Sequence, residues 1–146
     1  MAYMSQEKKK VIAQKMQALL KGTGIRYSLA VRNHLSIVLT VKSGPVDFLG
    51  NYKAAVRKEI ESGMSRYGAS DGRLEHVEAA KYVDVNVYHV GRQFSGKVGE
   101  LVQDMLDVLN TGNWDRSDSQ TDYFDVGHYV DFNIGRWNQP YVLTDA

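Results

Sequence analysis

The sequence contains no cysteine and no long run of apolar residues. Without cysteine, disulfide bonds and thiolate metal sites are excluded. The apolar runs are far too short to cross a bilayer, which needs about 20 residues. A glycine-rich phosphate loop of the Walker or dinucleotide type is also missing. We therefore expect no metal, no cofactor and no contact with a membrane.

Length and composition are those of an ordinary globular protein. The 146 residues match the usual size of one domain, and the shares of 43% apolar and 24% charged residues argue against general disorder. We expect residues 1–146 to form a single α+β domain. The N-terminal residues run into amphipathic sequence and do not resemble a secretory signal, so cytoplasmic residence is expected.

Charge is distributed unevenly along the chain, although the net charge is only +1. Residues 1–97 hold 16 Lys and Arg against 8 Asp and Glu, whereas residues 98–146 hold 2 against 9. Such asymmetry fits a basic surface for an acidic partner, an acidic surface for a basic partner, or head-to-tail association into a homo-oligomer. It is equally consistent with halves that intermix in the fold.

Hydrophobic periodicity predicts the secondary structure. Apolar residues at helical spacing predict helices over residues 5–21, 51–62 and 95–110. Alternation predicts strands over residues 27–31, 34–42, 81–90, 122–126 and 128–137. The economical fold for this order is a largely antiparallel sheet of about five strands with about three helices packed on one face.

One strand pattern occurs twice, as Tyr-Val-Asp-Val-Asn-Val at residues 82–87 and as Tyr-Val-Asp-Phe-Asn-Ile at residues 129–134. Because side chains alternate across a strand, a shared register means a shared facing. The apolar members should face the helices: Val83, Val85, Val87, Val130, Phe132 and Ile134. The polar members should lie together on the opposite face.

That polar face is the candidate site, because Asp and Asn are unusual in the middle of strands. Its carboxylates and amides could accept hydrogen bonds from a partner's arginines, and its tyrosines could stack on bases or pack against a protein. Trp137 joins it, since it follows the last strand and is expected to be exposed, and Trp and Tyr are enriched at binding hot spots. The alternative is a solvated outer face. The candidate partner-binding residues are Tyr82, Asp84, Asn86, Tyr88, Tyr129, Asp131, Asn133 and Trp137.

Two alternative functions rest on other residues. Clusters of lysine and arginine on two predicted helices could contact a nucleic-acid backbone, as in an accessory nucleic-acid-binding protein: Lys8, Lys9, Lys10, Lys53, Arg57 and Lys58. A solvated helix face would also explain them. A small nucleotide-binding protein or hydrolase could be built around His89 or His128, but no spacing specifies an active site. We expect no catalytic residues.

Residues 119–137, which include the Asp-Tyr-Phe and Asn-Ile-Gly segments, resemble small proteins encoded by phages and plasmids. In particular they are similar to a large polyvalent protein-associated domain of mobile elements. The resemblance covers less than half of the chain and carries no functional residue with it. It implies a mobile-element protein in the cytoplasm of a bacterial host. The function expected from it is non-enzymatic inhibition of a host defence system, such as a CRISPR or restriction complex, by binding a host protein or ribonucleoprotein.

Overall fold

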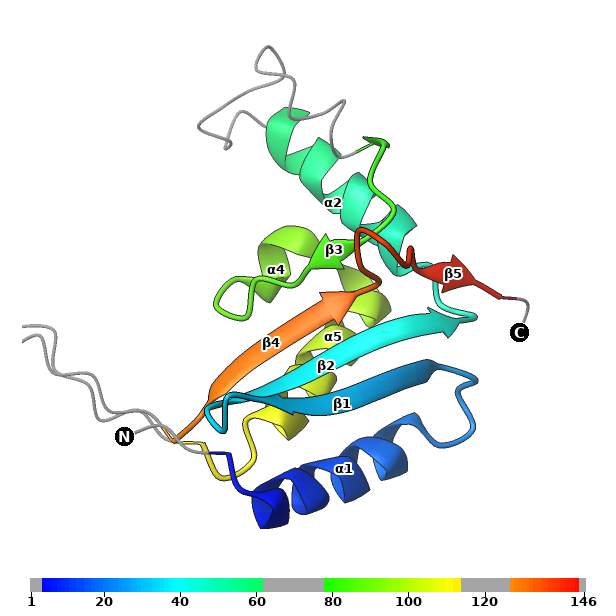
Figure 1. Cartoon of the computed structure of the whole chain (residues 1–146). Coiled ribbons are helices and arrows are strands. Elements are labelled where there is room, and N and C mark those ends of the chain that lie inside the picture. Colours follow the sequence, from blue (N-terminus) through cyan, green and yellow to red (C-terminus); the bar gives the residue numbers. More distant parts are fainter. Residues whose placement is uncertain (1–3, 62–77, 114–126, 145–146) are drawn as a thin grey trace, which may run out of the picture.

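A computed structural model describes residues 4–61, 78–113 and 127–144 of the chain. Figure 1 shows one sheet with its helices, coloured in the order of the sequence. They are α1 (Gln6–Leu20), β1 (Arg26–Arg32), β2 (Ser36–Gly44), α2 (Phe48–Glu61), β3 (Val83–Asp84), α4 (Val90–Gln93), α5 (Gly96–Leu109), β4 (Tyr129–Ile134) and β5 (Val142–Leu143).

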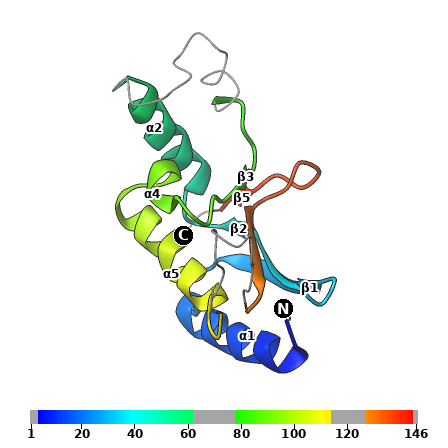
Figure 2. The same cartoon turned by 90° about the vertical axis from the view of Figure 1, so that its left-hand side faces the viewer.

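The sheet has the strand order β1-β2-β4-β3, and the short β5 pairs with the end of β2. β1 with β2 and β3 with β4 are antiparallel, whereas β4 runs parallel to β2. The described helices lie on one side of the sheet, and none of them covers the other side (Figure 2). The predicted α+β class with a largely antiparallel sheet is confirmed. The parallel pairing at the centre of the sheet is an addition that the sequence did not indicate.

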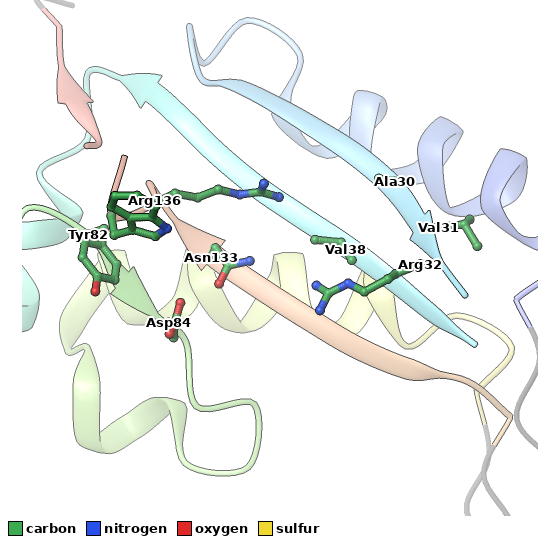
Figure 3. A pocket seen from close by; sticks show the side chains of 9 residues that line it. Ala30, Val31, Arg32, Val38, Tyr82, Asp84, Asn133 and Arg136 are labelled. Carbon is green, nitrogen blue, oxygen red and sulfur yellow. The ribbon is translucent and has the colours of Figure 1, made fainter. Parts of the chain in front are cut away.

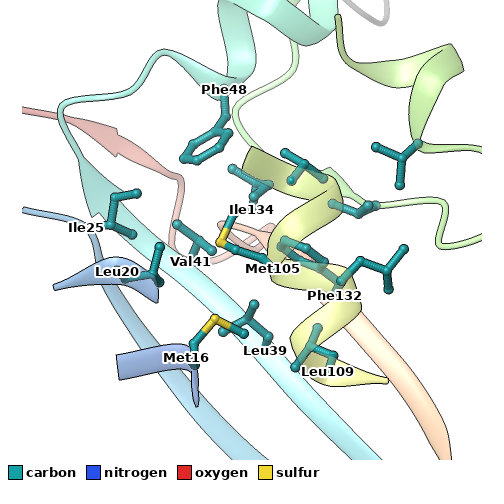
Figure 4. Close-up of a cluster of buried hydrophobic side chains, with 14 of the residues drawn as sticks. Met16, Leu20, Ile25, Leu39, Val41, Phe48, Met105, Leu109, Phe132 and Ile134 are labelled. Atoms are coloured by element: carbon teal, nitrogen blue, oxygen red, sulfur yellow. The ribbon is translucent and has the colours of Figure 1, made fainter. Parts of the chain in front are cut away.

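The core lies between the sheet and the helices. Large apolar side chains meet there, each contributing about 1.5–3 kcal/mol by its burial. Those from α1, β2, α5 and β4 are shown in Figure 4: Met16, Leu20, Leu39, Val41, Met105, Leu109, Phe132 and Ile134. Val83 and Val85 are also buried in this cluster. The predicted core side of the repeated strands is therefore confirmed.

Side-chain caps determine where the first two helices begin. The Ser5 hydroxyl oxygen accepts a hydrogen bond from the backbone N–H of Lys8 (3.1 Å), so α1 starts where the sequence predicts. α2 starts at Phe48, three residues earlier than predicted. There, Asp47 Oδ1 accepts a hydrogen bond from the backbone N–H of Gly50 (2.9 Å) and supplies the cap.

The strand predicted over residues 81–90 is wrong in its second half. β3 ends at Asp84, and the chain turns before α4 begins at Val90. Asn86 Oδ1 accepts a hydrogen bond from the backbone N–H of Tyr88 (3.0 Å), which is the local bond of an Asx turn. The valine alternation predicts a strand, but this side-chain bond to the backbone competes with the strand and ends it.

Two further strand boundaries differ because of backbone conformation. Asn33 and His34 have φ values of 54° and 56°, as both central residues of a type I′ turn require, so β2 begins two residues later than predicted. Gly135, with φ 71°, ends β4, so the strand predicted over residues 128–137 is shortened at both ends. The strand predicted over residues 122–126 lies outside the described residues.

Candidate functional site

The open side of the sheet carries the polar side chains of the repeated strands. Asp84 on β3 pairs in register with Asn133 on β4, so the two strands are neighbours. Asp131 lies two residues before Asn133 and points to the same side. Three residues that the sequence groups into one surface thus share the face opposite the helices.

An ion pair crosses the middle of this face. The guanidinium of Arg32 on β1 pairs with Asp131 on β4, across the intervening β2. Asn133 Nδ2 donates a hydrogen bond to Asp131 Oδ1 (3.2 Å) and orients that carboxylate. Val38 of β2 is aligned with Asp131 and is buried even though it faces the open side. The pair is exposed and worth about 0–1 kcal/mol, so its main effect is to set the positions of these charges.

Arg136 covers the next part of β2. Its Nη2 donates a hydrogen bond to the hydroxyl oxygen of Thr40 (2.9 Å), which is itself buried. Figure 3 shows the side chains of Arg136 and Arg32 approaching each other over the open face. Neither arginine is among the partner-binding residues predicted from the sequence. Strand alternation could have placed Arg32 on this face, but it could not have identified Asp131, 99 residues away, as the partner of Arg32.

Trp137 projects from a tight turn that follows β4. The backbone N–H of Arg136 donates to the carbonyl oxygen of Gln139 (2.8 Å), and the N–H of Gln139 donates to the carbonyl oxygen of Arg136 (3.1 Å). The indole is 77% exposed, as the sequence predicts. The N–H of Tyr141 donates to the carbonyl oxygen of Lys81 (3.0 Å), which brings the turn beside the start of β3.

Tyr141 anchors the base of this turn in the core. Its hydroxyl group lies 2.6 Å from the carbonyl oxygen of Val46 and 3.2 Å from that of Gly44, and it donates its proton to them. Its ring meets Phe48 edge-on, with 5.5 Å between the ring centroids. Burial, with a smaller contribution from the negative charge of Asp47, raises the pKa of Tyr141 to about 12. The turn is therefore held by a neutral, buried side chain.

Two adjacent grooves surround the Trp137 turn. The larger has a volume of about 610 Å³ and includes Arg32, Arg136 and the aligned residues of β1, β2 and β4 (Figure 3). The smaller, of about 440 Å³, lies toward α2 and α4. Both are lined by Tyr82, Asp84 and Trp137, which therefore form the wall between them. Asn133 also lines the larger groove, so four of the eight predicted partner-binding residues lie there.

The other predicted site residues lie apart from the grooves. Asn86 uses its side chain in the Asx turn, and Tyr88 is 85% exposed beyond that turn, because the strand that was to align them ends early. Tyr129 is exposed on the open face but at the start of β4, about 17 Å along the strand from its far end. The polar face is thus a groove region at one end of β4 and not a continuous stripe.

The predicted basic residues do not form one surface. They lie on α1 and α2, at opposite ends of the helical layer (Figures 1 and 2): Lys8, Lys9 and Lys10 on α1, and Lys53, Arg57 and Lys58 on α2. Lys8 Nζ donates to the carbonyl oxygen of Gly127 (3.3 Å), and burial lowers the pKa of Lys8. Arg57 forms an ion pair with Glu78, and this hydrogen-bonded partner raises the pKa of Arg57.

The two histidines considered for catalysis, His89 and His128, lie apart from the grooves. His128 is buried, and its Nε2 lies 2.8 Å from the carbonyl oxygen of Leu109. Its Nδ1 has no hydrogen-bond partner among the residues that the structure describes. Burial, with a smaller effect of the positive charge on Lys8, lowers the pKa of His128. His89 precedes the single turn of α4. Neither histidine lines the two grooves.

Comparison with protein-family models, with curated proteins and with solved structures found no match to this chain. Across residues 4–61, 78–113 and 127–144, no three His, Asp or Glu side chains are placed to hold a metal ion. In the same part of the chain, no helix is long and apolar enough to span a membrane. The surface around the two grooves is therefore the best basis for a functional proposal.

Proposed function

We propose that this chain is a non-enzymatic binding protein that docks a partner protein on the open face of its sheet. The observation that carries the proposal is the exposed Trp137, presented by a hydrogen-bonded turn at the wall between two grooves. Trp and Tyr supply most of the energy at many protein interfaces, and a rigid aromatic side chain loses little entropy on binding.

The chemistry of the grooves favours binding over catalysis. Among the described residues that line them there is a single carboxylate, that of Asp84, and no histidine. An activated nucleophile is held within hydrogen-bond reach of a base, and no hydrogen bond joins the Asp84 carboxylate to a described side chain. His128, one of the two histidines of the hydrolase alternative, is too deeply buried for a substrate to reach it. The other, His89, is exposed but lines neither groove.

The partner that we propose is a component of a host defence system, such as a CRISPR or restriction complex, in the cytoplasm of a bacterial host. This part of the proposal rests on the resemblance of residues 119–137 to a domain of mobile elements. The same segment contains β4 and Trp137. An inhibitor of this kind needs only a complementary surface and no reaction, which is consistent with the groove chemistry.

The test is capture of a partner from bacterial host lysate, identification by mass spectrometry and measurement of Kd with the purified partner. Trp137→Ala should weaken binding by about 2 kcal/mol or more, roughly 30-fold. Tyr88→Ala is the matched control, because Tyr88 is equally exposed but lies off the grooves. Equal effects of the two substitutions would refute docking at the open face. A steep loss of binding with rising salt would instead favour the nucleic-acid alternative.

A further inference from the structure

We infer that the wall between the two grooves is a receptor site for an arginine side chain of the partner protein. The site consists of Tyr82, Asp84 and Trp137, and we call it the Asp84 site. The inference rests on the proposed function, because the arginine belongs to the docked protein. It adds the chemistry by which that protein is recognised.

The carboxylate of Asp84 is the negative charge in the described lining of the two grooves. It is exposed, and it has no hydrogen bond or ion pair with any described side chain. The two arginines that line the larger groove are engaged elsewhere, since Arg32 pairs with Asp131 and Arg136 bonds to Thr40. In Figure 3 the side chain of Arg136 extends across β2 and away from Asp84. A cation from outside can therefore pair with Asp84 without displacing an internal one.

The neighbours of this carboxylate are aromatic. Tyr82 and Trp137 line the same two grooves as Asp84 and are 40% and 77% exposed. Cations are attracted to the faces of such rings, most strongly to tryptophan. Arginine fits this set better than lysine, because its planar guanidinium can stack on a ring while its N–H groups bind a carboxylate in bidentate fashion.

Both sides of the site are held in place before any ligand binds. Trp137 belongs to the turn anchored by Tyr141. On the other side, Gln93 of α4 covers the outer edge of β3. Its Oε1 accepts from the backbone N–H of Asn86 (2.6 Å) and its Nε2 donates to the carbonyl oxygen of Asp84 (3.2 Å). Because the carboxamide takes the place of a neighbouring strand, the Asp84 backbone is fixed between Gln93 and β4. Such preorganisation lowers the entropic cost of binding.

An anionic ligand fits the same wall less well. A phosphate group beside Tyr82 and Trp137 would meet the negative charge of Asp84. Of the cations that line the two grooves, Arg136 extends toward Thr40, Arg32 pairs with Asp131, and Lys81 lines only the smaller groove. Base stacking on the rings would therefore come with a repelled backbone.

The test uses the full chain labelled with ¹⁵N and the blocked tripeptide acetyl-Gly-Arg-Gly-amide. Trp137→Phe identifies the indole N–H signal of Trp137 and separates it from that of Trp114. We expect this signal to shift saturably with the arginine peptide and not with the isosteric citrulline peptide, which has no charge. Asp84→Asn should weaken the response roughly tenfold. Tyr82→Leu, which keeps the charge and removes a ring, should weaken it less.

Three results would overturn the inference. They are equal shifts with arginine and citrulline, an unchanged titration in Asp84→Asn with an unaltered melting temperature, and a stronger response to oligo(dT) than to the arginine peptide. Failure of this site and failure of the proposed function are distinguishable. If partner capture requires Trp137 but not Asp84, docking stands and the arginine site is wrong. If the peptide binds but capture does not require Trp137, the arginine site stands and docking at the open face is wrong.

Discussion

Replacement of Tyr141 by phenylalanine tests how the Trp137 turn is anchored. The variant keeps the ring against Phe48 and removes only the hydroxyl group that donates to the carbonyl oxygens of Val46 and Gly44. A buried acceptor left without its donor costs about 1–3 kcal/mol. We therefore expect Tyr141→Phe to lower the free energy of unfolding by this amount at pH 7, measured by urea denaturation followed by circular dichroism.

The difference between wild type and Tyr141→Phe should shrink in alkaline solution. In the folded chain the pKa of Tyr141 is raised to about 12, whereas an unfolded chain releases the proton near pH 10. Between these values the unfolded state binds fewer protons than the folded state, so the stability of the wild type falls as the pH rises. Two pKa units correspond to about 2.7 kcal/mol, which is as large as the expected advantage at pH 7.

Urea denaturation at pH 8, 9, 10 and 11 measures this effect, and subtraction of the variant cancels the titration of all other groups. Tyr88→Phe is the control, because the Tyr88 side chain is exposed and its loss of a hydroxyl should change stability at no pH. A wild-type advantage that stays constant from pH 8 to pH 11 would refute the burial of the Tyr141 proton. No advantage at pH 7 would refute the hydrogen bonds themselves.

Two further substitutions test backbone and burial. Gly135→Ala should lower the free energy of unfolding by more than about 1–2 kcal/mol, measured by urea denaturation. A positive φ alone costs a non-glycine residue about that much, and the new Cβ would also lie only 2.5 Å from the backbone nitrogen of Tyr141. Gly22→Ala has a positive φ but open space, so it should cost only the conformational part; equal losses would contradict the clash. Because burial lowers the pKa of His128, the unfolded chain takes up a proton that the folded chain excludes, and stability should fall below about pH 6.5. His128→Gln, which can still donate to the carbonyl oxygen of Leu109, should remove that pH dependence, and an unchanged dependence would contradict the assignment.

The facing of the repeated strands was predictable from the sequence, because alternation alone determines which side of a sheet a residue occupies. Phe132 and Ile134 had to be in the core once β4 formed, and Asp131 and Asn133 then had to face away. The neighbour relation of β3 and β4 was not predictable from either strand alone. It depends on which strands the chain connections bring together.

The length of β3 was not predictable from alternation, because two valid local patterns compete there. Val85 and Val87 continue the strand pattern, but Asn86 between them can bond to the backbone two residues on. The outcome is decided by Gln93, seven residues later, whose side chain binds the backbone N–H of Asn86. A contact between a helix and a strand edge leaves no periodic signal in the sequence.

The uneven charge of the chain has a different meaning in three dimensions from the one it suggests along the sequence. Of the acidic residues after position 97, Glu100, Asp104 and Asp107 lie on the exposed side of α5, and Asp131 is paired with Arg32. The acidic third therefore contributes no excess negative charge to the described part of the open face. What remains there is Asp84, which belongs to the basic part of the sequence. Under the proposed function, recognition by this face depends on the Asp84 carboxylate beside Tyr82 and Trp137, and a partner need present only one correctly placed cation to match it.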